Sequence, residues 1–166
     1  FDLTAASTGL NEKQARAAGV AYDKVVTYSA SHASYYPGAR NMTVKTLFDP
    51  ASGRILGAQI VGFDGVDKRM DVLAAAIRAG LTAEQLTELD LAYAPPYGSA
   101  KDPVNMAGYV IENVRAGLVE QHHWDAVAEL PADGSVILLD VRTPGEVRKQ
   151  GLLRSDALHI PLDELR

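Results

Sequence analysis

The chain has 166 residues, 47% of them hydrophobic and 22% charged, which is an ordinary composition for a soluble globular protein. This length allows one medium domain, or one domain and part of another. The net charge of −5 and the pI near 5.3 argue against a nucleic-acid-binding protein. No apolar run reaches the ~18–20 residues that a membrane-spanning helix needs.

Cysteine is absent from the sequence, which excludes disulfides, thiolate metal sites and a cysteine nucleophile within these residues. The four histidines lack the i, i+4 spacing of a helical zinc motif. We therefore expect surface histidines and no metal site. The first residues, FDLTAASTGL, show neither an initiating methionine nor a signal-peptide pattern, so we expect a fragment or a processed product.

The first part of the chain is expected to form strands around one short helix. An extended segment is predicted at residues 1–5. Asn11 is a typical helix N-cap and Gln14 follows three residues later, a capping-box spacing that predicts a helix closed by Gly19. Residues 20–29, VAYDKVVTYS, are rich in valine and tyrosine and predict a strand.

Residues 41–49 and 54–62 are β-like runs on either side of a turn at residues 50–53, and together they predict a β-hairpin. Alternation along the first run places four side chains on one face: Met42, Val44, Thr46 and Phe48. The second run contains GAQIVG, in which small residues interrupt an apolar strand and predict close packing by a helix.

Two helices are predicted after the hairpin. The first covers residues 66–79 and ends at Gly80. Its apolar residues form one stripe: Val66, Met70, Leu73 and Ile77. Three charged residues near its start predict a solvated face: Asp67, Lys68 and Arg69. Thr82, followed three residues later by Gln85, starts the second helix with a capping box.

Residues 91–105, LAYAPPYGSAKDPVN, combine two tyrosines with three prolines. Pro95 and Pro96 exclude a helix and preset an extended loop. Such a stiff loop can place the phenols of Tyr93 and Tyr97 accurately, or it can simply pack two aromatic rings. The residues alone leave both interpretations open.

A third helix is predicted to begin after this loop, with Asp102 as its N-cap and Pro103 as its first residue, and to stop at Gly117. The order of strands and helices up to this point predicts an α+β fold, an antiparallel sheet with helices on one face.

Near residue 117 the character of the sequence changes, and we expect a boundary between one domain at 1–117 and another at 118–166. A helix is predicted near residues 124–130. Residues 135–140, SVILLD, form a continuous apolar run, which is typical of a strand buried on both faces in a parallel sheet. Fewer than ~50 residues remain, too few for a stable α/β core, so we expect a truncated second domain.

Two segments, SHASYYPGA at residues 31–39 and VDKRMDVL…AYAPPYGSAKDPVNMAGYVIENV at residues 66–114, carry a family resemblance. Residues 1–117 resemble the C-terminal interface domain of the pyridine nucleotide-disulfide oxidoreductases. The similarity is greatest to the branch of coenzyme A-disulfide reductases, NADH oxidases and polysulfide reductases. In that branch, two tyrosines of the interface domain reach the partner subunit's redox cysteine, and they match Tyr35 and Tyr93.

The resemblance implies a cytoplasmic homodimer in which FAD and NAD(P)H bind to other domains of a longer protein, with coenzyme A as substrate or ligand. Tyr35 and Tyr93 are then expected to be catalytic, because a neutral phenol can donate a hydrogen bond to a leaving thiolate and protonate it. Three residues are expected to touch the partner subunit's flavin: Tyr93, Ala94 and Pro95.

Two hypotheses for function follow from different classes. In the first, the parent protein is an FAD-dependent NAD(P)H:disulfide oxidoreductase that reduces coenzyme A disulfide, persulfide or polysulfide, and this segment supplies tyrosines to the partner's site. In the second, the segment is a homodimerisation module without catalytic residues of its own. We expect the fragment alone to be inactive, because it contains no redox centre.

The final residues, LLDVRTPGEVRKQG…HIPLDEL, resemble the opening half of a rhodanese domain. The chain ends before the position at which a rhodanese carries its catalytic cysteine loop. Residues 118–166 are therefore expected to be an incomplete α/β rhodanese-like segment without sulfurtransferase activity.

Overall fold

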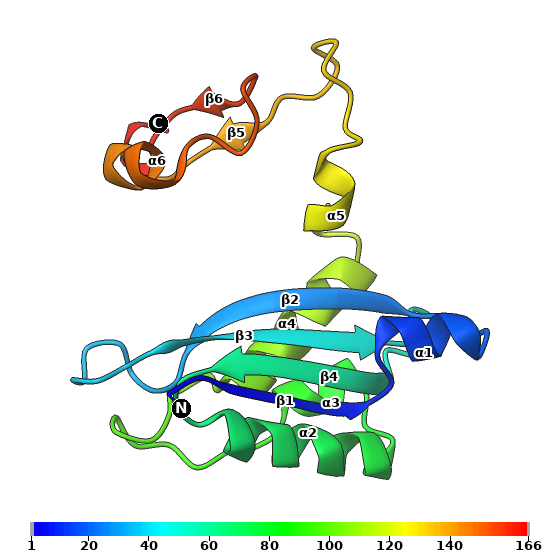
Figure 1. The fold of residues 1–166 in the computed structure, drawn as a ribbon. Helices are drawn as coiled ribbons and strands as arrows, with labels where there is room; N and C mark the ends of the chain where they lie inside the picture. Colours follow the sequence, from blue (N-terminus) through cyan, green and yellow to red (C-terminus); the bar gives the residue numbers. More distant parts are fainter. Residues whose placement is uncertain (1, 166) are drawn as a thin grey trace. The chain divides into compact units, whose positions relative to one another are not determined.

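The computed structural model describes residues 2–165. The chain divides into two units, Phe1–Glu120 and Gln121–Arg166, and each is described by itself (Figure 1). No helix within residues 2–165 combines the length and the apolar character that crossing a membrane requires.

The first unit is built on one antiparallel sheet in the order β1-β4-β3-β2 (Figure 1). Its strands are β1 (Thr4–Gly9), β2 (Asp23–Ala30), β3 (Asn41–Phe48) and β4 (Ile55–Gly62). The predicted hairpin is confirmed, since β3 and β4 are antiparallel neighbours. Of the extended segment expected at residues 1–5, Thr4 and Ala5 belong to β1, which pairs with β4 from Thr4↔Gly62 to Gly9↔Gly57, and residue 1 lies outside the described residues.

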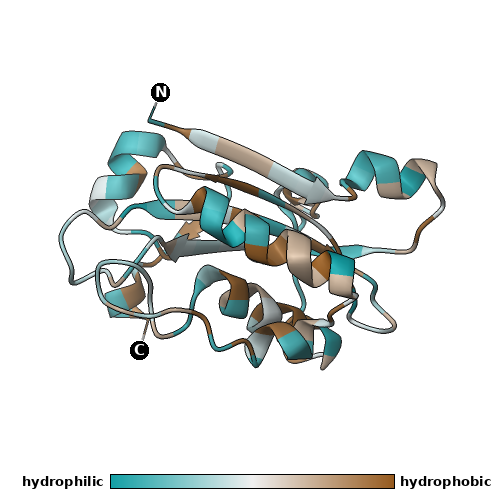
Figure 2. Cartoon of the chain, turned by 90° about the horizontal axis from the view of Figure 1, so that it is seen from below, coloured by the Kyte–Doolittle hydropathy of each residue, from teal (hydrophilic) through white to brown (hydrophobic). Residues whose placement is uncertain are grey.

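The helices of this unit are α1 (Glu12–Ala17), α2 (Val66–Ala79), α3 (Ala83–Thr87) and α4 (Pro103–Arg115). Three of them, α1, α3 and α4, begin where the capping residues predicted, and α2 begins directly after Gly65. Complete capping boxes start α1 at Asn11, α3 at Thr82 and α4 at Asp102. Brown and teal residues occur together on the helices in Figure 2, as expected for helices with one buried and one solvated side.

The core of the unit lies between one face of the sheet and the helices α2, α3 and α4. It includes the four β3 residues predicted to share a face: Met42, Val44, Thr46 and Phe48. They are buried together with residues of the three helices, among them Leu73, Leu86 and Ile111. On the opposite face, the side chains of Tyr28 and Val61 are exposed. The predicted α+β plan is therefore confirmed for the antiparallel sheet and for α2, α3 and α4 on one of its faces.

The short helix α1 departs from this plan, because it lies over one corner of the opposite sheet face. Glu12 at its start forms ion pairs with Lys24 of β2, at 3.1 Å, and with Lys45 of β3. Gly57 makes the approach possible, since a Cβ there would lie 1.8 Å from the carbonyl oxygen of Leu10. The close helix packing predicted for the small residues of β4 is found at Gly62, where a Cβ would lie 3.1 Å from Cγ2 of Val66 in α2, whereas Gly57 packs against the turn that precedes α1.

The charge of Glu12 is expected to make stability depend on pH. Burial alone would raise the pKa of Glu12, but the hydrogen bonds and charges of Lys45 and Lys24 lower it from 4.5 to about 2. A lowered folded-state pKa stabilises the fold fully above the usual value of 4.5, and this contribution is lost as the pH falls toward about 2.

We expect a contribution of roughly 1–2 kcal/mol after solvent screening. Urea unfolding of the chain and of Glu12→Gln at pH 7 and near pH 2 measures it. The parent should lose more free energy of unfolding between these pH values than the variant. Equal losses in both proteins would contradict the assignment.

The second unit contains short elements only. They are α5 (Trp124–Val127), β5 (Leu139–Asp140), α6 (Pro144–Gln150), β6 (Leu158–His159) and a 3-10 turn at Leu162–Glu164. The prediction of a doubly buried strand at residues 135–140 was wrong. Only its last two residues are β, and they pair in parallel with β6 alone, which leaves Ile137 73% and Leu139 43% exposed. A two-stranded sheet has no layers to cover both faces.

Candidate active site

Two loops of the first unit carry the tyrosines that the sequence singled out. We call residues 31–40, between β2 and β3, and residues 88–102, between α3 and α4, the tyrosine loops. They lie against each other, since the backbone N–H of Ala33 donates to the carbonyl oxygen of Gly98 at 3.0 Å. The fold therefore brings together two segments that are far apart in the sequence.

The hydroxyl oxygens of Tyr35 and Tyr93 lie 3.2 Å apart, at hydrogen-bonding distance. Both rings are open to solvent, with 75% of Tyr35 and 52% of Tyr93 exposed. The hydrogen bond to Tyr93 is the main cause that raises the pKa of the Tyr35 hydroxyl above its usual 10.0. Tyr35 is therefore a neutral phenol at physiological pH, and the exposed pair can offer an O–H to a ligand.

The proline segment beside Tyr93 forms a tight turn. The N–H groups of Tyr97 and Gly98 both donate to the carbonyl oxygen of Ala94, at 2.8 and 3.1 Å. Ala94 and Pro95 are half-buried, whereas Tyr97 is exposed. The extended loop predicted from the two prolines is therefore wrong at residues 95–97, where the backbone turns directly after Tyr93 and Ala94.

Buried polar groups anchor the other tyrosine loop, residues 31–40. The His32 ring is 5% exposed, contacts the hydroxyl of Ser31 through Nδ1 at 3.1 Å and the carbonyl of Pro37 through Nε2 at 3.3 Å. Tyr36 meets the His32 ring edge to face, with centroids 5.9 Å apart. The expectation of a surface histidine is wrong for His32, because the loop folds over its ring. Its hydrogen bonds hold the backbone that presents Tyr35.

Arg69 was missed by sequence reasoning, which assigned it to a solvated face. Only 2% of it is exposed, and its guanidinium pairs with the carboxylate of Asp102 at 2.9 Å. The helical spacing could have predicted this burial, since position 69 lies three residues after Val66 and four before Leu73, on the buried stripe of α2. Its charge argued for the surface, and only its distant partner explains the burial.

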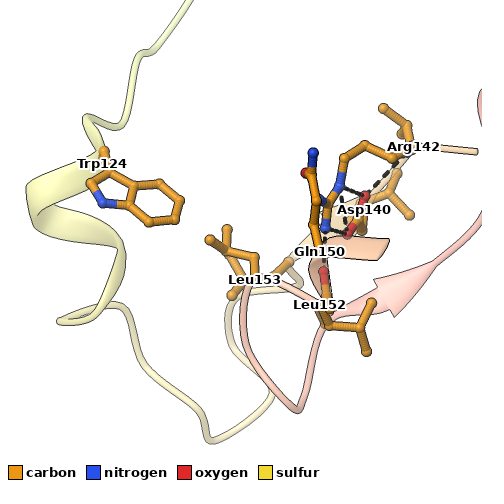
Figure 3. A pocket seen from close by; sticks show the side chains of 11 residues that line it. Trp124, Asp140, Arg142, Gln150, Leu152 and Leu153 are labelled. Carbon is orange, nitrogen blue, oxygen red and sulfur yellow. Dashed lines mark hydrogen bonds and ion pairs between the residues drawn. The ribbon is translucent and has the colours of Figure 1, made fainter. Parts of the chain in front are cut away.

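The second unit holds an open pocket of about 570 Å³ (Figure 3). Trp124 and Leu153 border it on one side, and the ion pair between Arg142 and Asp140 on the other. This ion pair holds the pKa of Asp140 at about 2. None of the tyrosines predicted to be functional lines the pocket. Within residues 2–165, no group of three or more histidine, aspartate or glutamate side chains is placed to hold a metal ion.

Comparison with known proteins identifies the family. The profile described as "Pyridine nucleotide-disulphide oxidoreductase, dimerisation domain" matches residues 1–103. The chain belongs to this family. The match includes both tyrosines of the pair and reaches Asp102, so the candidate site lies within the dimerisation domain.

Relatives within the pyridine nucleotide-disulphide oxidoreductases include enzymes that act on sulfur compounds. Coenzyme A disulfide reductase of Staphylococcus haemolyticus (strain JCSC1435) is 46% identical over 109 residues, which cover 66% of this chain and 24% of the relative. This chain therefore spans about a quarter of the length of that relative.

Two solved structures are similar over the whole chain. Reduced Bacillus anthracis CoADR-RHD has a TM-score of 0.92 and 49% identity, and the match covers 100% of this chain and 29% of that chain. The NAD-dependent persulfide reductase from A. fulgidus has a TM-score of 0.85 and 42% identity, and the match covers 99% of this chain and 29% of that chain. Both similarities thus extend beyond the dimerisation domain into the second unit.

Proposed function

We propose that this chain is the C-terminal portion of an FAD-dependent NAD(P)H:disulfide oxidoreductase that reduces coenzyme A disulfide, persulfide or polysulfide. It supplies the interface of a cytoplasmic homodimer and a pair of tyrosines to the partner subunit's active site. The observation that carries this proposal is the hydrogen-bonded, exposed pair of Tyr35 and Tyr93 hydroxyls, 3.2 Å apart. The names of the two sulfur-reducing relatives support the substrate class.

The exposure of the pair supports its action on a group outside its own fold. A tyrosine ring normally buries much of its area in packing, yet both of these rings remain largely exposed. The chain contains no cysteine, so the sulfur on which the phenols act belongs to another part of the assembly. An interface domain that presents the two tyrosines to a partner subunit accounts both for their exposure and for a sulfur atom that comes from outside this chain.

The chemistry of the pair suits the reduction of a disulfide. Cleavage of an S–S bond by two electrons releases a thiolate, and a positioned O–H stabilises that anion and can protonate it. The raised pKa of Tyr35 keeps its proton on the oxygen, so Tyr35 can donate to Tyr93 while Tyr93 donates outward. We assign this donor role to both residues.

The residues of this chain fit a contact with FAD, although they do not form its binding domain. An antiparallel sheet with one covered face is not the parallel βαβ fold that binds dinucleotides. The exposed ring of Tyr93 and the half-buried Ala94 and Pro95 form a fixed surface that can lie against the partner subunit's flavin. When bound, FAD and NAD(P)H supply the electrons that reduce the disulfide.

Hybrid dimers of the full-length protein test whether the tyrosines act in the partner's site. One subunit lacks the redox cysteine and keeps both tyrosines, while the other keeps the cysteine and carries Tyr35→Phe and Tyr93→Phe. If the tyrosines act across the interface, the hybrid has one intact site and keeps about half of the parent turnover. If they act within their own subunit, the hybrid is as inactive as either variant homodimer.

The same experiment tests the alternative of a purely structural dimerisation module. In that case the homodimer of the double phenylalanine variant would show full turnover, because the chemistry would need nothing from the tyrosine loops.

We further propose that residues 118–166 are the first part of a rhodanese-like domain, which follows the interface domain at residues 1–117 in the sequence. The parallel pair β5 and β6, joined through α6, has the βαβ arrangement of an α/β domain. The division of the structure after Glu120 lies close to this boundary.

A further inference from the structure

Arg69 carries a full positive charge inside the first unit, and its side chain is 2% exposed. Burying an ion pair costs desolvation that the attraction between the charges barely offsets, so apolar residues of similar volume in place of both partners would serve stability as well. Stability alone therefore does not explain a buried guanidinium at this position.

The contacts of Arg69 indicate this role, because they reach one end of each tyrosine loop. Its Nη2 donates to the carbonyl oxygen of Ser31 at 2.7 Å and to Oδ2 of Asp102 at 2.9 Å. Ser31 is the first residue of the loop that carries Tyr35, and Asp102 is the last residue of the loop that carries Tyr93. Nε adds a further hydrogen bond to Oδ2 of Asp102 at 3.1 Å.

The carboxylate that receives Arg69 is itself fixed. Its Oδ1 accepts from the N–H of Val104 at 3.1 Å, which caps α4, and the backbone N–H of Asp102 donates to Oδ1 of Asn105 at 3.0 Å. The Nδ2 of Asn105 in turn donates to the carbonyl of Leu86 at 2.9 Å. Asp102 is thus tied to α3 and α4, and Arg69 connects this fixed point to Ser31 at the end of the other tyrosine loop.

The backbone around the guanidinium is shaped to admit it. Gly65 has a left-handed φ of 64°, and a Cβ there would lie 2.1 Å from Nη1 of Arg69. Gly65 also accepts a hydrogen bond from Nη1 through its carbonyl oxygen, at 3.2 Å. The planar fork of the arginine therefore donates to Ser31, to Asp102 and to the N-cap of its own helix in a rigid geometry that a lysine ammonium does not reproduce.

We propose that Arg69 is a positioning residue for the tyrosine pair. By joining the Ser31 end of one tyrosine loop to the Asp102 end of the other, it holds the Tyr35 and Tyr93 hydroxyls at hydrogen-bonding distance. Its consequence for catalysis rests on the function proposed above, whereas its consequence for the hydroxyl distance does not.

The test uses the full-length holoenzyme with Arg69→Lys, which keeps the charge, and Asp102→Asn, which keeps an N-cap residue but removes the charge. Crystal structures of the variants measure the distance between the two hydroxyl oxygens. Turnover measures catalysis, and we expect kcat for disulfide reduction to fall by roughly 10- to 100-fold with KM almost unchanged. Arg78→Lys, at an exposed position of the same helix, is the matched control and should change neither readout.

A second readout separates positioning from general damage to the fold. Arg69→Lys is combined with Tyr35→Phe and Tyr93→Phe. If Arg69 acts through the tyrosines, the lysine substitution has little further effect once both hydroxyls are gone, because effects that share one route are not additive.

Two results would overturn the proposal. One is a variant structure in which the hydroxyls stay at hydrogen-bonding distance, and the other is an equal loss of turnover from Arg69→Lys with and without the hydroxyls. If the double phenylalanine variant alone keeps full turnover, the proposed catalytic function fails. The hydroxyl distance in the Arg69 variant then still decides whether Arg69 positions the pair.

Discussion

Replacement of both Tyr35 and Tyr93 by phenylalanine in the full-length enzyme is expected to lower kcat for disulfide reduction by roughly 100-fold or more, the usual contribution of a positioned proton donor. The substitutions remove the two hydroxyls, 3.2 Å apart, and keep the rings. Stopped-flow absorbance should show flavin reduction by NADH at the parent rate, because the loss falls on the later step in which a thiolate leaves. Steady-state turnover with a disulfide substrate measures that step.

A matched control is Tyr97→Phe, which removes a hydroxyl from a similarly exposed ring in the same loop. Its turnover should stay close to that of the parent. Each single substitution in the pair should cost less than the double one if the remaining phenol can still donate. Equal turnover of the double variant and the parent would remove the catalytic assignment, and slower flavin reduction would place the defect elsewhere.

Asp102→Ala is expected to destabilise the first unit by roughly 3–5 kcal/mol, because it leaves the buried guanidinium of Arg69 without its counter-charge. The cost includes the loss of the cap of α4, which by itself is worth about 1 kcal/mol. Both groups are almost fully buried, with side-chain exposures of 2% for Arg69 and 3% for Asp102, so water cannot replace the lost partner. Urea unfolding of the chain, followed by circular dichroism, measures the change.

The exposed pair between Glu112 and Arg115 on α4 provides the control. These side chains are 37% and 28% exposed, and their ion pair is 3.0 Å long. Glu112→Ala should cost no more than about 0.5 kcal/mol, as is usual for ion pairs of this kind on a helix surface. Similar losses for Asp102→Ala and Glu112→Ala would show that burial does not govern the strength of the Arg69 contact.

Local chemistry was sufficient to predict where the elements of the first unit begin. Asn11, Thr82 and Asp102 each satisfy the first N–H groups of a helix, and this requirement is set by a few neighbouring residues. The hairpin of β3 and β4 was equally predictable, because two alternating runs flank a turn, although the register shifts between Leu47 and Phe48. Local rules failed at residues 135–140. Their apolar pattern predicted a strand buried on both faces, but only Leu139 and Asp140 form a strand, and it pairs with β6 alone.

The sequence by itself determined the capped helix starts and the hairpin. Only the tertiary structure decided that Tyr35 meets Tyr93 and that Arg69 is buried. Each of these contacts joins residues more than 30 positions apart, and their distance depends on how α2 and α4 pack on the sheet. A charged side chain within the apolar stripe of a helix can be exposed to solvent or buried with a partner. Arg69 is buried because it pairs with Asp102, and no local sequence pattern connects these two residues.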